Sequence, residues 1–110
     1  MGEVSMAEFV KAHAAGAAVI DVGDVEEYNR GHVPGAVSLP LGELSRDLSA
    51  ARCRIRRDAP VYVTCAAGNR SLIATGMLMH AGYDAYSVLG GTNGWVKAGH
   101  PVVGGDRVRY

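Results

Sequence analysis

The sequence is poor in cysteine, aromatic residues and net charge, and it contains no long hydrophobic run. Two cysteines in 110 residues provide no disulfide framework, so a reducing cytoplasm is the expected compartment. Basic and acidic side chains balance at 11 each, which removes the bulk electrostatic basis for binding nucleic acid or an anionic membrane. No apolar run is long enough to span a bilayer, and the first ten residues carry no signal-peptide pattern. We therefore expect a cytoplasmic protein without a membrane or nucleic-acid partner.

Histidine and cysteine also lack the spacing of a metal site. The four histidines are scattered, and Cys53 and Cys65 do not form a CxxC motif. We therefore expect neither a metal nor a cofactor. Glycine, by contrast, is abundant at 15 residues, which implies many tight turns or close backbone approaches.

Short apolar runs alternate with helical patterns along the chain. Strands are predicted at 18–22, 36–39, 61–64 and 84–89, and helices at 5–15, 25–30, 41–53 and 71–81, with a further short helix around Trp95. This alternation predicts one α/β domain over residues 1–110, with a mostly parallel sheet. Ligands of such sheets bind beyond the carboxyl ends of the strands. The VYVT strand ends directly at Cys65, so we expect the chemistry there.

The segment CAAGNRS, residues 65–71, has the composition of an anion-binding loop. Three small residues after the cysteine allow several backbone N–H groups to point inward, and Ser71 can cap the helix that follows. The helix N-terminus adds partial positive charge, so the Cys65 sulfur should be stabilised as the nucleophilic thiolate. Arg70 adds a fixed cation at the rim. Two simpler interpretations stay open: Cys65 as a buried structural thiol, and Arg70 as a loop brace paired with an acid.

Three stretches agree in order and spacing with one known family. They are VIDVGDVEEYNRGHVPGAVSLP at 19–40, VYVTCAAGNRS at 61–71 and AGYDAYSVLGGTNGWVKAGHPV at 81–102. Together they cover almost the whole chain, which therefore resembles the single-domain rhodanese-like (thiosulfate sulfurtransferase) family. The resemblance implies a three-layer α/β fold, with a central parallel sheet flanked by helices.

The same resemblance implies a sulfurtransferase in which Cys65 accepts a sulfane sulfur and becomes a persulfide. The donor would be a small sulfur-containing anion such as thiosulfate or a protein persulfide, and the acceptor cyanide or a thiol. Related phosphatases and arsenate reductases carry one more residue between the cysteine and the arginine, so the shorter loop here favours sulfur transfer over those activities. The expected substrate-binding residues are Ala66, Ala67, Gly68, Asn69, Arg70 and Ser71.

The sequence departs from the common family pattern at three positions. Gly23 stands where many relatives have arginine, and Ala66 and Ala67 replace a basic or polar residue and a serine. One lost charge at about 4 Å is worth roughly 1–4 kcal/mol at surface-like dielectric. The sequence therefore argues more strongly against thiosulfate as donor than against persulfide chemistry. A sulfur-relay or regulatory binding module with little thiosulfate turnover is the alternative function.

Acidic and imidazole groups near the first strand are expected to support the site. Asp21 ends that strand and could pair with Arg70 or orient the loop, and Glu27 and His32 are expected to brace the fold. His32 as a general base is the alternative, although a thiolate with a lowered pKa needs no base.

The segment ARCRIRRD combines Cys53 with four arginines between positions 52 and 57. We expect Cys53 to be an inert thiol, with a resolving cysteine as the alternative. The arginines predict a solvated basic face, or else a surface for an acidic partner or a component of a thiolated-RNA pathway. The sequence leaves the oligomeric state and the physiological sulfur donor open.

Overall fold

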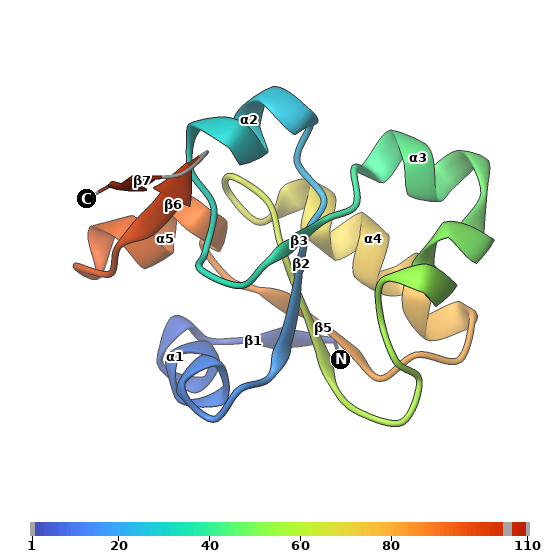
Figure 1. The fold of residues 1–110 in the computed structure, drawn as a ribbon. Helices are drawn as coiled ribbons and strands as arrows, with labels where there is room; N and C mark the ends of the chain where they lie inside the picture. Colours follow the sequence, from blue (N-terminus) through green and yellow to red (C-terminus); the bar gives the residue numbers. More distant parts are fainter. Residues whose placement is uncertain (1, 105–106, 110) are drawn as a thin grey trace.

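A five-stranded parallel sheet forms the centre of the computed structural model (Figure 1), which describes residues 2–104 and the backbone of residues 107–109. The strands lie in the order β1 (Glu3–Val4), β5 (Ala85–Val88), β4 (Val61–Thr64), β2 (Ala18–Asp21) and β3 (Val37–Ser38). Every pairing between neighbouring strands is parallel. The predicted α/β class with a parallel sheet is confirmed.

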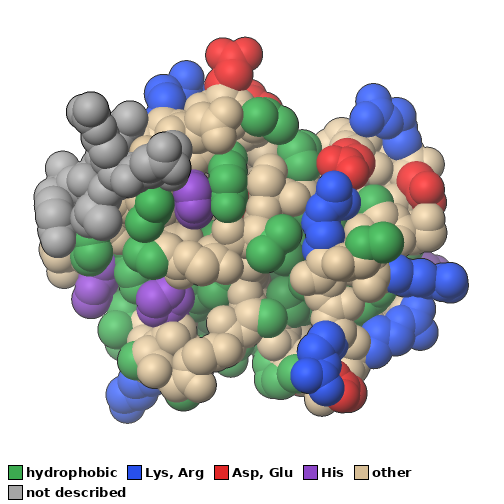
Figure 2. All heavy atoms as spheres, viewed as in Figure 1, with side chains coloured by type: hydrophobic (Ala, Val, Ile, Leu, Met, Phe, Trp, Pro, Cys, Tyr) green, Lys and Arg blue, Asp and Glu red, His purple; other side chains and the backbone are tan. Residues whose placement is uncertain are grey.

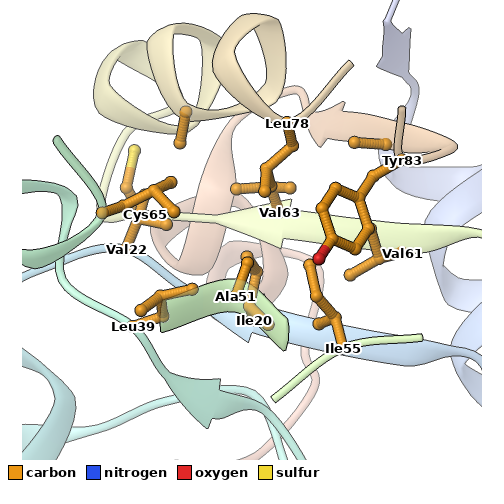
Figure 3. Packing of buried hydrophobic residues seen from close by; sticks show 13 residues of the cluster. Ile20, Val22, Leu39, Ala51, Ile55, Val61, Val63, Cys65, Leu78 and Tyr83 are labelled. Atoms are coloured by element: carbon orange, nitrogen blue, oxygen red, sulfur yellow. The ribbon is translucent and has the colours of Figure 1, made fainter. Parts of the chain in front are cut away.

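Helices cover both faces of this sheet. On one face lie α3 (Leu41–Arg46), the 3-10 helix η1 (Leu48–Cys53) and α4 (Asn69–His80); on the other lie α1 (Met6–Ala14) and α5 (Gly91–Lys97). The strands alternate accordingly, because successive side chains of a strand point to opposite faces. Ile20 packs beneath α4 with the core shown in Figure 3, whereas its neighbour Val19 packs with Phe9 and Trp95. These layers are the expected three-layer arrangement.

A short helix and a two-stranded antiparallel sheet lie together beyond the carboxyl end of the parallel sheet. The helix α2 (Val25–Arg30) lies against β6 (Val102–Gly104), which pairs antiparallel with β7 (Arg107–Arg109). His32 and Val103 join this pair to the rest of the molecule through two reciprocal backbone hydrogen bonds of 2.9 Å. The chain that follows β2 is therefore held close to the residues that follow α5.

The predicted helix over 41–53 is interrupted, which corrects the sequence-based expectation. The α-helix ends at Arg46, and the chain restarts as η1 after Asp47, whose backbone is extended at φ −151° and ψ 100°. The Asp47 side chain accepts a hydrogen bond from the Ser49 N–H at 3.0 Å. An aspartate that binds a backbone N–H two residues ahead competes with helix propagation, and the apolar periodicity does not reveal this competition.

The helix after the active loop begins two residues earlier than predicted, at Asn69, and ends at His80. The residue at its N-cap is Gly68, with φ +103°, and not Ser71. Among the residues that the structure describes, no helix is long and apolar enough to cross a bilayer. The same residues contain no group of three or more metal-binding side chains. A cytoplasmic location stays a prediction.

Candidate active site

Cys65 lies where β4 ends, at the carboxyl edge of the sheet, and it is buried at 1% exposure. The backbone then curls over the sulfur. The N–H groups of Gly68 and Ser71 donate hydrogen bonds to the Cys65 Sγ at 3.1 and 3.3 Å. The predicted loop with inward-pointing N–H groups is therefore present, and the sulfur lies at its centre.

The outer side of this loop is fixed by the start of α5. Thr92 and Asn93 donate their backbone N–H groups to the carbonyl oxygens of Cys65 and Ala66, at 2.8 and 3.0 Å. These contacts turn the loop carbonyls away from the sulfur. The approach is so close that a Cβ at Gly91, where φ is +56°, would lie 2.2 Å from the Cys65 carbonyl oxygen. Gly91 is therefore required for this loop conformation.

Ser71 contacts the sulfur with its side chain as well as its backbone. Its Oγ lies 3.5 Å from the Cys65 Sγ and 2.8 Å from the Oγ of Ser87, and both serines are buried. When Cys65 is a thiol, its S–H donates to Ser71; when the sulfur is ionised, the Ser71 hydroxyl can donate to it while accepting from Ser87. Ser71 therefore stabilises the sulfur directly, and the expectation that its side chain caps the helix is wrong.

The pKa of Cys65 reflects two opposing influences. Burial is the largest single influence and favours the neutral thiol. The Ser71 hydroxyl and the N–H groups of Ser71, Gly68 and Ala67 together outweigh burial, so the thiol pKa lies below its ordinary value. This direction is the one that a nucleophilic sulfur needs.

Arg70 does not present a free cation to the loop. Its Nη1 and Nη2 donate to Oε1 and Oε2 of Glu27 at 2.6 and 2.8 Å, in a bidentate ion pair. The guanidinium, together with the backbone N–H of Asp24, lowers the pKa of Glu27 to about 2. Glu27 also forms a capping box with Asp24 at the start of α2, because each side chain accepts the other residue's backbone N–H. This pair connects the loop to α2.

Asp21 is buried and does not take the place suggested for it beside Arg70. Its Oδ1 accepts the N–H of Gly23 at 2.8 Å, while the arginine pairs with Glu27. Burial raises the pKa of the Asp21 carboxyl; the Gly23 N–H, and more weakly His32 and Arg70, oppose that rise. A Cβ at position 23 would lie 3.0 Å from Oδ1, so glycine allows the chain to turn tightly around this carboxyl.

His32 supports the fold beside this carboxyl. Its ring stacks on Tyr28 with centroids 3.7 Å apart, and its Nδ1 lies 2.8 Å from the Tyr28 carbonyl oxygen. The Tyr28 hydroxyl in turn donates to the Ala36 carbonyl at 2.6 Å. These contacts agree with the bracing role expected for His32 and do not involve the sulfur.

Comparison with known proteins agrees with this geometry. The sequence model of the rhodanese-like domain matches residues 5–98, which is most of the chain. The chain belongs to the rhodanese-like domain family. The resemblance seen in the sequence is thereby confirmed, and the cysteine loop at the end of β4 lies inside the matched region.

Two curated relatives carry sulfur-related names. A putative sulfur carrier protein of Bacillus subtilis is 30% identical over 78 residues, which are 70% of this chain and 40% of that protein. A chloroplastic thiosulfate sulfurtransferase of Arabidopsis thaliana is 31% identical over 96 residues, which are 79% of this chain and 80% of that protein. This rhodanese-like chain therefore spans less than half of the bacterial relative.

Solved rhodanese-like structures share the fold closely. A rhodanese-related protein of Thermoplasma volcanium superposes with a TM-score of 0.82 at 29% identity, over 94% of this chain and 98% of that one. A human single-domain sulfurtransferase superposes with a TM-score of 0.76 at 27% identity, over 88% of this chain and 96% of the other. The expected rhodanese-like fold is confirmed.

The segment 52–57, which contains Cys53 and four arginines, lies at the end of η1 and in the chain that follows it. Cys53 is an exposed free thiol at the end of η1. Arg54 forms an ion pair with Glu43 at 3.0 Å, and Arg56 forms a two-bonded pair with Asp58. Acidic side chains accompany the basic ones on the α3 side of Figure 2. Local pairing thus offsets part of the predicted basic face.

Two parts of the site are not predicted from the sequence. Ser87 is separated from Ser71 by 16 residues, and its signal is only a polar residue within the apolar strand AYSV. The partnership of Glu27 with Arg70 spans 43 residues. The D-x-x-E pattern at 24–27 is that of a capping box, like S-x-x-E at 5–8, and could have placed the Glu27 side chain at the start of a helix.

Proposed function

We propose that this protein is a sulfurtransferase that carries a sulfane sulfur as a persulfide on Cys65. The Cys65 thiolate attacks the sulfane sulfur of the donor. If the donor is thiosulfate, the S–S bond breaks and sulfite leaves with its electron pair; if the donor is a persulfide, a thiolate leaves. A thiol or cyanide then attacks the outer sulfur, and Cys65 leaves as the thiolate. No net oxidation occurs over the cycle.

The arrangement around the sulfur supports this proposal. Two backbone N–H groups, from Gly68 and Ser71, converge on the Cys65 Sγ inside the six-residue loop 65–70. A terminal sulfur added to Cys65 would extend about 2 Å beyond Sγ, which is the length of an S–S bond. An anionic sulfur in such a loop is stabilised by N–H dipoles that need no reorganisation.

The charges around the loop favour a persulfide donor over thiosulfate. Ala66 and Ala67 add no cation, and the Arg70 guanidinium is engaged with Glu27 through both terminal nitrogens. A dianion would therefore meet less positive charge than a loop with a free basic residue provides. This observation also favours the second candidate function, a relay that receives sulfur from a protein partner and turns over little thiosulfate.

A matched pair of cysteine variants tests the proposal. Cys65→Ser removes the only sulfur held by the loop, whereas Cys53→Ser removes the exposed thiol on η1. Each protein is given glutathione persulfide and then cyanide, and thiocyanate is measured. We expect Cys53→Ser to retain the wild-type rate and Cys65→Ser to fall to the rate without protein. Retained turnover in Cys65→Ser would refute the role of Cys65.

A further inference from the structure

The 3-10 helix η1 lies beside the second half of α4 (Figure 1), and a groove follows the outer side of the two helices. One part of the groove, the apolar half, has a volume of about 500 Å³ and is lined by Leu48, Ile73, Gly76, Met77 and His80. A helix rises about 1.5 Å per residue, so the stretch from Ile73 to His80 is about 10 Å long. An extended peptide advances about 3.3 Å per residue, and about three of its residues therefore cover the apolar half.

The α4 helix is apolar on its outer side as well as on its inner side. Its residues 71–80 contain no aspartate, glutamate, lysine or arginine. Leu78 is fully buried against the sheet. Leu72, Ile73 and Met79, by contrast, are 46%, 59% and 47% exposed. A surface helix of a soluble protein usually carries polar side chains outward, and an exposed apolar surface of this kind marks a site of interaction.

The groove continues into a basic half toward the end of η1. This half consists of two adjoining hollows, and Arg52, Arg57 and Tyr83 line both of them. Leu48 lines one of these hollows, and it lines the apolar half as well. The apolar half and the basic half therefore share a wall and form one continuous surface.

The two arginines of the basic half differ from the other two of the segment 52–57, whose acidic partners are Glu43 and Asp58. Among the described residues, neither Arg52 nor Arg57 forms an ion pair, and neither guanidinium donates a hydrogen bond. A guanidinium carries five N–H donors. Both arginines therefore retain donors for an acceptor that enters the groove.

The weaker contacts that these two arginines make leave their donors available. The Arg57 Cζ lies 5.1 Å from the centroid of the Tyr83 ring, and a guanidinium above a ring keeps its N–H groups for acceptors in its own plane. Arg52 attracts Asp47 only over a longer distance, because Asp47 accepts its hydrogen bonds from Ser49. The basic half therefore has an excess of positive charge.

An acidic peptide that also carries aliphatic side chains complements both halves of the groove. Carboxylates pair with guanidinium groups in bidentate geometry, and aliphatic side chains are stabilised when they leave water for an apolar surface. An RNA strand complements the basic half alone, because no lysine or arginine lines the apolar half to meet its phosphates. The combination of the two halves therefore favours a peptide over a nucleic acid.

We propose that this groove binds an acidic peptide segment of a partner protein, with carboxylates on Arg52 and Arg57 and aliphatic side chains in the apolar half. The binding is non-covalent and uses no residue of the active loop. The inference goes beyond the proposed sulfur transfer and does not depend on it. It assigns a function to the two arginines that have no acidic partner and to the uncharged outer side of α4.

The test measures the binding of fluorescein-labelled peptides by fluorescence anisotropy. The probe peptide has three leucines at one end and three glutamates at the other, and it is made in both chain directions. A second peptide has glutamines in place of the glutamates, and a third has serines in place of the leucines. Arg52→Gln/Arg57→Gln is compared with Lys11→Gln/Lys97→Gln, which removes the same charge from exposed positions of α1 and α5 on the opposite face of the sheet.

We expect wild-type protein to bind the probe with a Kd of about 100 μM or below. The double arginine variant is expected to weaken this binding about tenfold, and the double lysine variant to leave it unchanged. Ile73→Ser is expected to weaken it about fivefold, whereas Val25→Ser, at a similarly exposed position of α2, does not. Cys65→Ser leaves these values unchanged, so a failure here is distinct from a failure of the proposed sulfur transfer.

Four results would overturn the inference. The first is a Kd above about 1 mM for the probe in both chain directions. The second is equally tight binding of the peptide without leucines or of the peptide without glutamates, because the groove then uses only one of its halves. The third is tighter binding of an oligouridine than of the probe. The fourth is a dimeric protein that Ile73→Ser converts to a monomer, because a second copy of the chain then occupies the groove.

Discussion

The Oγ of Ser87 lies 2.8 Å from the Oγ of Ser71, which in turn lies 3.5 Å from the Sγ of Cys65. Ser87 is on β5, the strand next to β4, and it is 1% exposed. The sheet therefore positions a hydroxyl behind the serine that contacts the sulfur. Ser87 acts through Ser71 and is a positioning residue.

Ser87→Ala is expected to raise the pKa of Cys65, because Ser71 then loses the donor that polarises its hydroxyl. Ser71→Ala should raise it further, since the direct hydrogen bond is lost. The measurement is the rate of alkylation by iodoacetamide as a function of pH. Ser45→Ala, on the exposed surface of α3, is the control. If the alkylation rate has its pH midpoint at the same value in Ser87→Ala and in wild type, Ser87 does not act on Cys65 through Ser71.

The Glu27–Arg70 pair should make stability depend on pH at the acidic end. The pKa of Glu27 in the folded protein is about 2, below its ordinary value of 4.5. A carboxyl with a depressed folded pKa stabilises the protein above the unfolded value, and this stabilisation is lost as the pH falls toward the folded value. The contribution is therefore present above about pH 5 and decreases between pH 5 and pH 2.

Glu27→Gln is expected to lower the free energy of unfolding by about 1–2 kcal/mol at pH 7, a figure reduced for solvent screening of this partly exposed pair. The difference from wild type should shrink toward pH 2.5. Urea unfolding at both pH values measures it, and Glu26→Gln on the exposed side of α2 is the control. A loss of stability that is equal at both pH values would show that the ion pair is not its source.

Gly91 and Gly76 offer a matched pair of glycine substitutions. A Cβ at Gly91 would clash with the Cys65 and Ala66 carbonyl oxygens, whereas a Cβ at Gly76 in α4 meets nothing within 4 Å. We expect Gly91→Ala to destabilise the protein by about 3 kcal/mol or more and to abolish sulfur transfer. Gly76→Ala should stabilise it by roughly 1 kcal/mol and retain transfer. Thermal unfolding and thiocyanate assays on both variants check these results, and full activity in Gly91→Ala would contradict the described loop.

Added positive charge at the loop should improve the use of thiosulfate. Ala67 is exposed in the loop, and its N–H contributes to the lowered pKa of Cys65. Ala67→Lys is expected to raise the rate of sulfite release from thiosulfate about tenfold at low salt, and the gain should diminish as salt screens the charge. Ala98→Lys, at the exposed end of α5, adds the same charge away from the loop. Equal effects of both lysines would contradict a local electrostatic cause.

The elements that sequence analysis predicted well are those set by neighbouring residues. The helix predicted over 5–15 is present and begins at a Ser5–Glu8 capping box, with both reciprocal bonds at 3.1 Å, and Cys65 directly follows a buried strand as predicted. The failures involve competing or distant contacts. Asp47 interrupts a helix whose apolar period continues, because its side chain binds the Ser49 N–H.

Two contacts between residues far apart in the chain could not be predicted from the sequence, because both depend on how the elements assemble. Two acids, Asp21 and Glu27, are candidate partners of Arg70 in the sequence. Arg70 pairs with Glu27 because α2, which starts at a capping box that includes Glu27, places this side chain beside the guanidinium. Ser87 reaches Ser71 only after β5 pairs with β4. Neither relation has a local periodicity, so both emerge only from the assembled sheet.

The most direct test of the central claim is intact-mass spectrometry of the purified protein. The protein is incubated with a sulfane-sulfur donor, first thiosulfate and then glutathione persulfide, before and after the addition of cyanide. We predict a gain of one sulfur atom, located at Cys65 by peptide mapping and removed by cyanide with release of thiocyanate. Absence of that gain with both donors, or its location at Cys53, would contradict sulfur transfer through Cys65.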